Sequence, residues 1–199
     1  MKTKILVVSI FLTLGAASAF AQATADTVQR DVNQQTRIEN GLKDGSLSTK
    51  EAGRLEKEQN QVDRLQAKDL RDGKLSPQES AQLRRAQDKA SRDINAARSN
   101  EVKGNPQTAS SQRMQADVQR NVDQESRIEQ GVKSGSLTKR EAGQLERGQA
   151  RVDRKEALAA RNGHVGKREQ ANIQTAENHQ SKEIFEDKHN EHAAHRNRK

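Results

Sequence analysis

The segment LKDGSLSTKEAGRL, residues 42–55, combines the end of one helix, a tight turn and the start of a second helix. Gly45 suits the left-handed backbone conformation that commonly closes a helix. Ser48 and Glu51 have the spacing of a capping box, in which each side chain binds a backbone N–H at the new helix start. Leu47 lies between the glycine and the cap, where we expect it to turn inward. The segment therefore predicts a helical hairpin with a short glycine turn.

Variants of this unit recur along the chain, as LRDGKLSPQESAQL (70–83), VKSGSLTKREAGQL (132–145) and ARNGHVGKREQANI (160–173). A longer repeat relates the two halves of the chain. Residues 28–65 align with residues 118–155 at a constant offset of 90, with 22 identities in 38 positions. This internal duplication predicts that both halves share one fold.

The turns predict an all-α protein of two tandem three-helix modules, in residues 24–97 and 114–190. The predicted helices cover residues 27–43, 49–71, 77–97, 114–133, 139–161 and 167–190. The segment between the modules, residues 98–113, contains Gly104, Pro106 and small polar residues, so we expect a flexible linker there. Residues 191–199 form a predicted basic, histidine-containing tail.

Residues 1–21 have the pattern of a secretory signal peptide. Lysines precede an apolar stretch from Ile5 to Leu14, and small residues near Ala21 offer a cleavage site. The apolar stretch is shorter than the roughly 20 residues that a membrane-spanning helix needs. We therefore expect an exported bacterial protein, periplasmic or secreted, with no transmembrane segment in the mature chain.

The composition limits the classes of function. Cysteine is absent, so disulfides are excluded, and Leu, Ile, Val and Phe make up 25 of the 178 residues that follow residue 21, which predicts a thin core. The net charge of +8 comes from Lys and Arg that alternate with Asp and Glu on nearly every turn. Phe185 is the one aromatic residue after residue 21, so base stacking has little support and we expect no nucleic-acid partner. No nucleophile elbow or phosphate-binding glycine loop is present, which predicts a non-enzymatic protein.

The glycine turns resemble the second half of an EF-hand calcium loop. The residues that this resemblance would assign to calcium are Asp44, Glu51, Asp72, Glu79 and Glu141. The earlier ligand positions include Leu42 and Lys68, which supply no oxygen for calcium. The capping box explains the same glutamates without a metal. The two alternatives for these residues are therefore a structural cap and a calcium ligand.

A second candidate metal site lies near the end of the chain. His189, His192 and His195 are spaced by three residues, so a continuing helix would place them on neighbouring positions. Imidazole is a common ligand of zinc, copper and nickel. The alternative is a polar tail without a metal.

Most of the mature chain resembles small exported bacterial proteins with the pattern RIxxGxxxGxLTxxEAxxL, then DGxLTxxE, and a KHN segment near the end. The matching segments are RIENGLKDGSLSTKEAGRL, DGKLSPQE, RIEQGVKSGSLTKREAGQL and Lys188–Asn190. The resemblance implies export and a helical repeat, and it implies no activity or cofactor.

These observations predict a non-enzymatic interaction or accessory protein of the cell envelope. Its two helical modules would present polar surfaces to an envelope protein or an anionic surface. The alternative is a metal-binding protein, with calcium at the glycine turns or a divalent transition metal at the histidines.

Overall fold

The computed structural model describes residues 15–190, and their side chains from Gln22 onward. Within this range the chain is all-helical, which confirms the predicted fold class. The elements are α1 (Gly15–Asp44), α2 (Thr49–Asp69), α3 (Pro77–Ser99), α4 (Ala109–Ser134), α5 (Lys139–Ala159), the 3-10 turn η1 (Ala160–Asn162) and α6 (Lys167–Lys188). Most of the predicted signal peptide and the predicted tail lie outside the described residues.

The glycine turns form as the sequence predicts. Positive φ angles of 74°, 78°, 75° and 85° occur at Gly45, Gly73, Gly135 and Gly163. At the start of α2, the Ser48 hydroxyl accepts a hydrogen bond from Glu51 N at 3.3 Å, and Glu51 Oε2 accepts one from Ser48 N at 3.0 Å. Equivalent capping boxes begin α3 at Ser76 and α5 at Thr138. Leu47 is 1% exposed, so it turns inward as expected.

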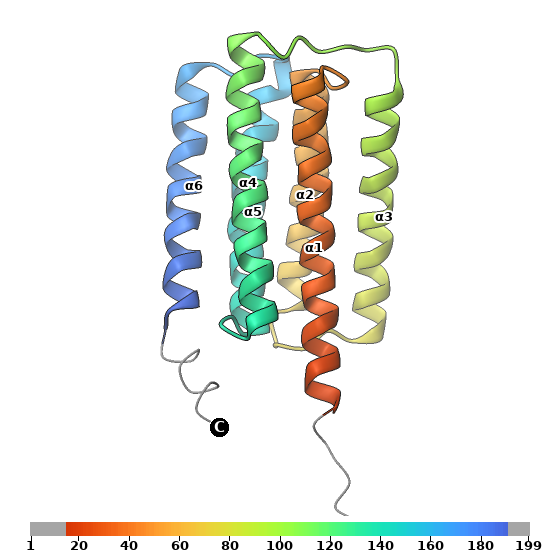
Figure 1. The fold of residues 1–199 in the computed structure, drawn as a ribbon, viewed down its shortest axis with the longest axis vertical. Helices are drawn as coiled ribbons and strands as arrows, with labels where there is room; N and C mark the ends of the chain where they lie inside the picture. The colour runs from red at the N-terminus through yellow and green to blue at the C-terminus, as the bar shows by residue number, and fades with distance from the viewer. Residues whose placement is uncertain (1–14, 191–199) are drawn as a thin grey trace, which may run out of the picture.

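The two halves of the chain share one bundle, which differs from the predicted pair of separate modules. The most extensive helix contacts join the halves, α2 with α5 and α1 with α4. Successive helices run in opposite directions, and α3 and α6 lie on the two flanks (Figure 1). A three-helix unit with so few large apolar residues leaves one side of its inner helices uncovered, and the other half covers it.

Glycine permits the close approach of α2 and α5. A Cβ atom on Gly53 would lie 2.6 Å from Ala160 Cβ, and one on Gly143 would lie 2.8 Å from Leu70 Cβ. Both distances are shorter than real Cβ contacts allow. The glycines of the two EAG motifs therefore mark the places where the helices of the two halves touch. These two contacts are equivalent under the offset of 90 residues.

The connection between the halves is short and packed against the bundle. It runs from Asn100 to Thr108, since α4 begins at Ala109 within the predicted linker. Gly104 N donates a hydrogen bond to Gly45 O at 2.9 Å. A Cβ atom on Gly104 would lie 2.1 Å from Leu47 O, so only glycine fits. This connection is therefore fastened to the first glycine turn, where the sequence predicts a flexible joint.

Most buried apolar side chains gather at the two ends of the bundle, and a smaller cluster of Val62, Leu83 and Ala90 joins α2 to α3. One end is formed around Ile38, Leu42, Leu47, Leu55, Ile94, Met114, Val118 and Ile173. The other is formed around Val28, Leu70, Leu75, Ile128, Val132, Leu145 and Ile184. Among the helices that the structure describes, none combines the length and the apolarity needed to cross a bilayer.

Candidate metal centre

Carboxylates and amides fill the middle of the bundle, between its apolar ends. On α2 the inward-facing positions follow alternating spacings of four and three residues, as Ala52, Glu56, Gln59, Asp63, Gln66 and Leu70. Polar residues thus take positions that a helical bundle normally gives to apolar ones. We call the following acids, each at most 2% exposed, the core carboxylates: Asp31, Glu56, Asp63, Glu125, Glu146, Asp153 and Glu156.

The first cluster joins Asp31 of α1, Asp63 of α2 and Glu146 of α5. One carboxylate oxygen from each lies within 4.8 Å of the others. Burial and the neighbouring Asp31 raise the pKa of Glu146 well above its usual value, and the amide of Gln66 opposes this rise. Both Glu146 oxygens and both polar atoms of the Gln66 amide lack a well-formed hydrogen bond. This cluster therefore holds buried polar atoms with unused bonding capacity.

The second cluster joins Glu56 of α2 to Asp153 and Glu156 of α5. Its carboxylate oxygens also lie within 4.8 Å of one another. Asn121 Nδ2 donates a hydrogen bond to Glu156 Oε2 at 2.8 Å, and Gln35 Nε2 donates one to Glu56 Oε2 at 3.0 Å. The other oxygen of each of these glutamates has no partner. The amides thus orient the carboxylates and leave one side of each open.

The offset of 90 residues that relates the halves also exchanges the two clusters. The equivalent pairs are Asp63 with Asp153, Glu146 with Glu56, Asp31 with Asn121, and Gln66 with Glu156. In the last two pairs an acid in one half corresponds to an amide in the other, and the two exchanges run in opposite directions. Each cluster therefore keeps three carboxylates and one carboxamide, although the acids do not occupy the same positions.

The two clusters lie next to each other where α2 packs against α5. Burial raises the pKa of Asp63 well above its usual value, and the neighbouring carboxylate of Asp153 raises it further. One helical turn away, the Asn60 amide donates to the main-chain oxygen of Ala150, its equivalent in the other half. The clusters are therefore two parts of one polar centre.

Nothing basic neutralises this centre from inside. Among the described residues, the buried side chains include no Lys, Arg or His. Burial raises the pKa of Asp31 and of Glu56 to about 7, against the opposing hydrogen bonds of Gln87 and Gln35. An ionised carboxylate without a partner costs several kcal/mol or more in such surroundings. The centre therefore needs protons or bound cations.

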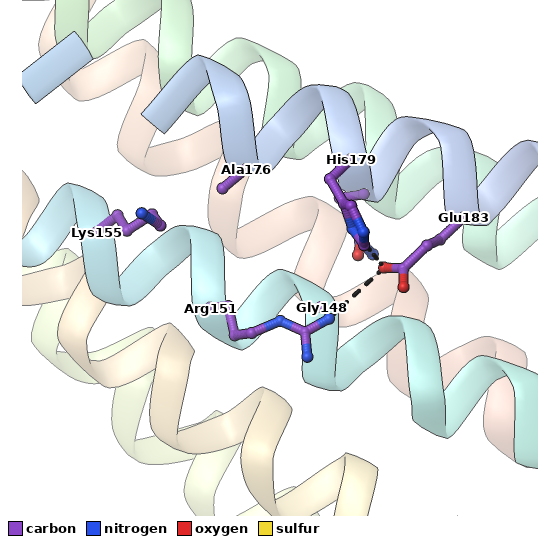
Figure 2. Close-up of a pocket in the computed structure, with 7 residues that line it drawn as sticks. Gly148, Arg151, Lys155, Ala176, His179 and Glu183 are labelled. Carbon is purple, nitrogen blue, oxygen red and sulfur yellow. Dashed lines mark ion pairs between the residues drawn. The ribbon is translucent and has the colours of Figure 1, made fainter. Parts of the chain in front are cut away.

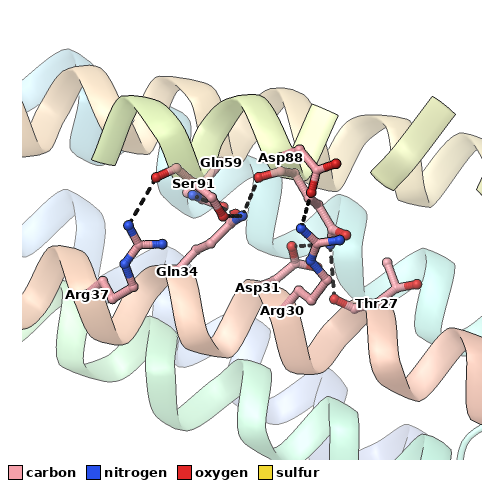
Figure 3. A network of polar contacts seen from close by, with 9 residues as sticks. Thr27, Arg30, Asp31, Gln34, Arg37, Gln59, Asp88 and Ser91 are labelled. Atoms are coloured by element: carbon pink, nitrogen blue, oxygen red, sulfur yellow. Dashed lines mark hydrogen bonds and ion pairs between the residues drawn. The ribbon is translucent and has the colours of Figure 1, made fainter. Parts of the chain in front are cut away.

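Helix α3 fixes the first cluster from its flank. Gln87 Nε2 donates to Asp31 Oδ1 at 2.7 Å, and Gln34 Nε2 donates to the Gln87 main-chain oxygen at 2.7 Å. Figure 3 shows Asp31 and Gln34 of α1 directed toward α3. In the second half Glu177 of α6 takes the place of Gln87, and Arg120 Nε lies 3.1 Å from its Oε2.

The glutamates of the EF-hand-like turns are used in helix caps. Besides Ser48, Glu51 binds Asn100, whose Nδ2 donates to its Oε1 at 2.8 Å. The aspartates of these turns accept main-chain hydrogen bonds two residues ahead, at Ser46 for Asp44 and at Lys74 for Asp72. Glu79 and Glu141 bind the N–H groups of Ser76 and Thr138. The predicted turn ligands do not come together in any described cluster of three metal-binding groups.

The histidine site can be followed only at its first member. His189 stacks on Phe185 with ring centroids 4.2 Å apart, and its Nδ1 lies 2.7 Å from the Phe185 main-chain oxygen. His192 and His195 lie outside the described residues. A shared site for the three histidines therefore stays a prediction.

Sequence reasoning missed the core carboxylates, although the sequence carries a signal for them. Leu55 and Val62 of α2 suggest an apolar stripe, whereas the positions that face α5 are Glu56 and Asp63, one residue further on. Glu56 and Asp63 are seven residues apart and lie on the same side of the helix as Ala52 and Leu70. This shared side is the pattern that distinguishes a buried acid from a surface one. The equivalent pattern in α5 has Glu146 and Asp153.

The arrangement can accept protons or hard cations at two adjacent places inside one helical bundle. Comparison of the chain with protein-family models, with curated proteins and with solved structures finds no match, so its function is inferred from this site.

Proposed function

We propose that this protein binds divalent cations in the middle of its helical bundle, one at each carboxylate cluster. The observation that carries the proposal is the pair of buried three-carboxylate clusters, related by the duplication and lacking any buried base. This is a metal-binding role, as in the sequence-based alternative, but at different residues.

The spacing of the carboxylates fits a single ion in each cluster. Calcium binds oxygen ligands at 2.3–2.6 Å, so two oxygens on opposite sides of one ion are about 5 Å apart, and adjacent ones are closer. The oxygens of each cluster lie within 4.8 Å of one another. A cation between them would also engage the oxygens that have no hydrogen-bond partner, such as both oxygens of Glu146.

The chemistry of the ligands favours a hard cation. Carboxylate and amide oxygens suit calcium, magnesium and manganese, whereas zinc and copper prefer sites with histidine or cysteine. Magnesium usually keeps several of its waters, and the core carboxylates are almost completely enclosed. Calcium accepts six to eight protein oxygens, which three carboxylates and one carboxamide can supply. Calcium is therefore the best match.

The competing interpretation is a core neutralised by protons alone. In that case the amides that donate hydrogen bonds to the core carboxylates would serve only to hold the bundle together. The two interpretations differ in one measurable respect. A proton-filled core gains nothing from a divalent cation, whereas the free energy of unfolding of a protein with a cation site rises with the logarithm of the cation concentration above its Kd.

The test is calorimetric titration of the chelator-treated protein with calcium, manganese, magnesium and zinc at pH 7.5. We expect two calcium ions per chain, with protons released as they bind. The variant Glu146→Gln should lose one of the two ions, and Glu56→Gln should lose the other. Glu79→Gln is the matched control, because it changes a glutamate of a predicted turn and keeps the cap. Absence of heat with every ion, or loss of binding in the control alone, would refute the proposal.

The predicted role as a non-enzymatic envelope interaction protein stays a prediction. That prediction assumes two modules on a flexible linker, each with a polar surface of its own. In a single bundle, a partner would have to bind one face of the whole molecule.

A further inference from the structure

The exposed positions of α2 and α5 carry bases and no acids. The bases along α2 and just after its end are Lys50, Arg54, Lys57, Arg64, Lys68 and Arg71. Those along α5 and just after its end are Arg140, Arg147, Arg151, Arg154, Lys155 and Arg161. All of them are exposed, whereas every Asp and Glu of the two helices is buried or half-buried. We call these twelve residues the basic face.

The alternation of charge along the sequence conceals this separation. Bases recur on α2 at spacings of four, three and seven residues, which keeps them on one side of the helix. Acids such as Glu56 and Asp63 have the same period in a different phase, so they point into the bundle. The sequence suggests an even mixture of charges on the surface, and the structure corrects this. On α2 and α5 the bases of the basic face are exposed, and the acids are buried or half-buried.

The basic face occupies one side of the molecule. Helices α2 and α5 lie side by side behind α1 and α4 in the view of Figure 1. Each has 21 residues, so the face is about 30 Å long. On α1 and α4 the exposed charged residues are three acids and two lysines, and the arginines of these helices are half-buried; the exposed ones are Asp26, Lys43, Asp44, Asp123 and Lys133. A molecule with this distribution turns one side toward a negative surface.

Few carboxylates neutralise the basic face. Among the ion pairs of the described residues, one involves it, between Arg151 and Glu183 of α6 at 3.6 Å. Figure 2 shows this pair at the edge of the face, where Glu183 also lies 3.3 Å from His179. Arg64 and Arg154, at the centre of the face, have no carboxylate within 4 Å among the described residues.

We infer that the basic face binds the surface of an anionic phospholipid bilayer. The bases are spread over two parallel rows, which matches a flat array of phosphates better than a single strand of charge. Neither helix exposes an aromatic residue on which a nucleic-acid base could stack, and the whole chain has no Trp or Tyr. Leu158 is the one exposed large apolar residue of the two helices, so the contact is peripheral and electrostatic.

The test is sedimentation of the full chain with vesicles in the presence of EDTA, so that bound cations play no part. Vesicles of phosphatidylcholine with 30% phosphatidylglycerol are compared with vesicles of phosphatidylcholine alone. The variant with Arg64, Arg147 and Arg154 replaced by Gln loses three bases of the face. Each basic residue near an anionic surface contributes about fivefold to binding, so we expect a loss of about 100-fold at low salt.

The matched control replaces Arg84, Arg85 and Arg92 of α3 by Gln, which removes the same charge from the flank. We expect it to bind within about threefold of wild type. All chains carry the same N-terminus, so the apolar segment contributes equally. If the first variant unfolds by circular dichroism, Lys57, Lys68 and Arg161 replace the three arginines.

Three results would overturn the inference. The first is an equal loss in both variants, which would mean that net charge alone matters. The second is equal binding to the anionic and the neutral vesicles. The third is tighter binding to duplex DNA than to anionic vesicles at equal phosphate concentration, which would assign the face to a different polyanion.

Discussion

Replacing Asp31 by Asn should stabilise the cation-free protein at pH 8 and weaken its response to calcium. Asn121 already occupies the equivalent position of the second half, so the side chain fits this place in the bundle. Asn Oδ1 can still accept the hydrogen bond that Gln87 donates to Asp31. The substitution therefore removes a charge and little else.

The magnitude follows from the pKa of Asp31, which burial raises from 3.8 to about 7 in the folded protein. The folded state then holds a proton that the unfolded state has lost, so the free energy of unfolding falls as the pH rises from about 4 to about 7. Each pKa unit corresponds to about 1.4 kcal/mol, which makes the total cost about 4 kcal/mol at pH 8. The Asn variant escapes this cost, and its melting temperature should be about 10 °C higher.

Calcium should stabilise wild type more than the Asp31→Asn variant. At a calcium concentration of 100 times its Kd, wild type gains about 2.7 kcal/mol. A variant with tenfold weaker affinity gains about 1.4 kcal/mol at the same concentration. The assay is thermal unfolding at pH 4, 6 and 8, with EDTA or calcium. The reasoning fails if Asp31→Asn lowers the melting temperature at pH 8 in EDTA, or if its gain from calcium equals that of wild type.

Three further predictions concern the bundle itself. Gly53→Ala should lower the free energy of unfolding by about 1–3 kcal/mol, because its Cβ would lie 2.6 Å from Ala160 Cβ, and adding Ala160→Gly should restore part of the loss in urea unfolding. Thr138→Ala should cost about 1 kcal/mol by removing the cap of α5, whereas Thr138→Ser should cost far less in the same assay. The fragment 22–101 should form a homodimer in light scattering, because a second copy can supply the surface that the other half covers, and a helical monomer would contradict this pairing.

The local structure could be predicted from the sequence, because its signals are themselves local. Glycine closes a helix and Ser48 with Glu51 opens the next, and these effects depend on residues within one turn. The fourth repeat unit, residues 160–173, matches the others least and still follows this rule. Gly166 replaces the capping hydroxyl residue there, yet Glu169 Oε2 still accepts a hydrogen bond from Gly166 N at 2.8 Å.

The pairing of the halves could not be predicted in this way. Periodicity shows which side of a helix is apolar, but it does not show which helix covers that side. The EAG glycines carried a hint, since Gly53 and Gly143 lie inside helices where glycine is normally unfavourable. A close approach of another backbone is one of the few reasons to keep them. The packed connection at Gly104 follows from the same pairing.

The candidate site was hidden by the ordinary rule that acids lie on the surface. Glu and Asp are almost never fully buried without a partner, and Glu56 and Glu146, both 0% exposed, depart from this rule. In the sequence, these glutamates differ from the exposed charges only in that they lie on the same helix side as buried apolar residues. The glutamates among the candidate turn ligands match a short motif, and their oxygens serve the helix caps.

The exchange of acid and amide between the two clusters has a consequence for how such a protein can evolve. In a symmetric dimer every substitution appears twice, so a change from Asp to Asn alters both sites together. Joining two copies in one polypeptide releases this constraint, and each copy can then drift separately. Asp31 with Asn121, and Gln66 with Glu156, are two such divergences that offset each other in charge. A fused gene can in this way give two neighbouring carboxylate clusters different chemistry while the fold stays the same.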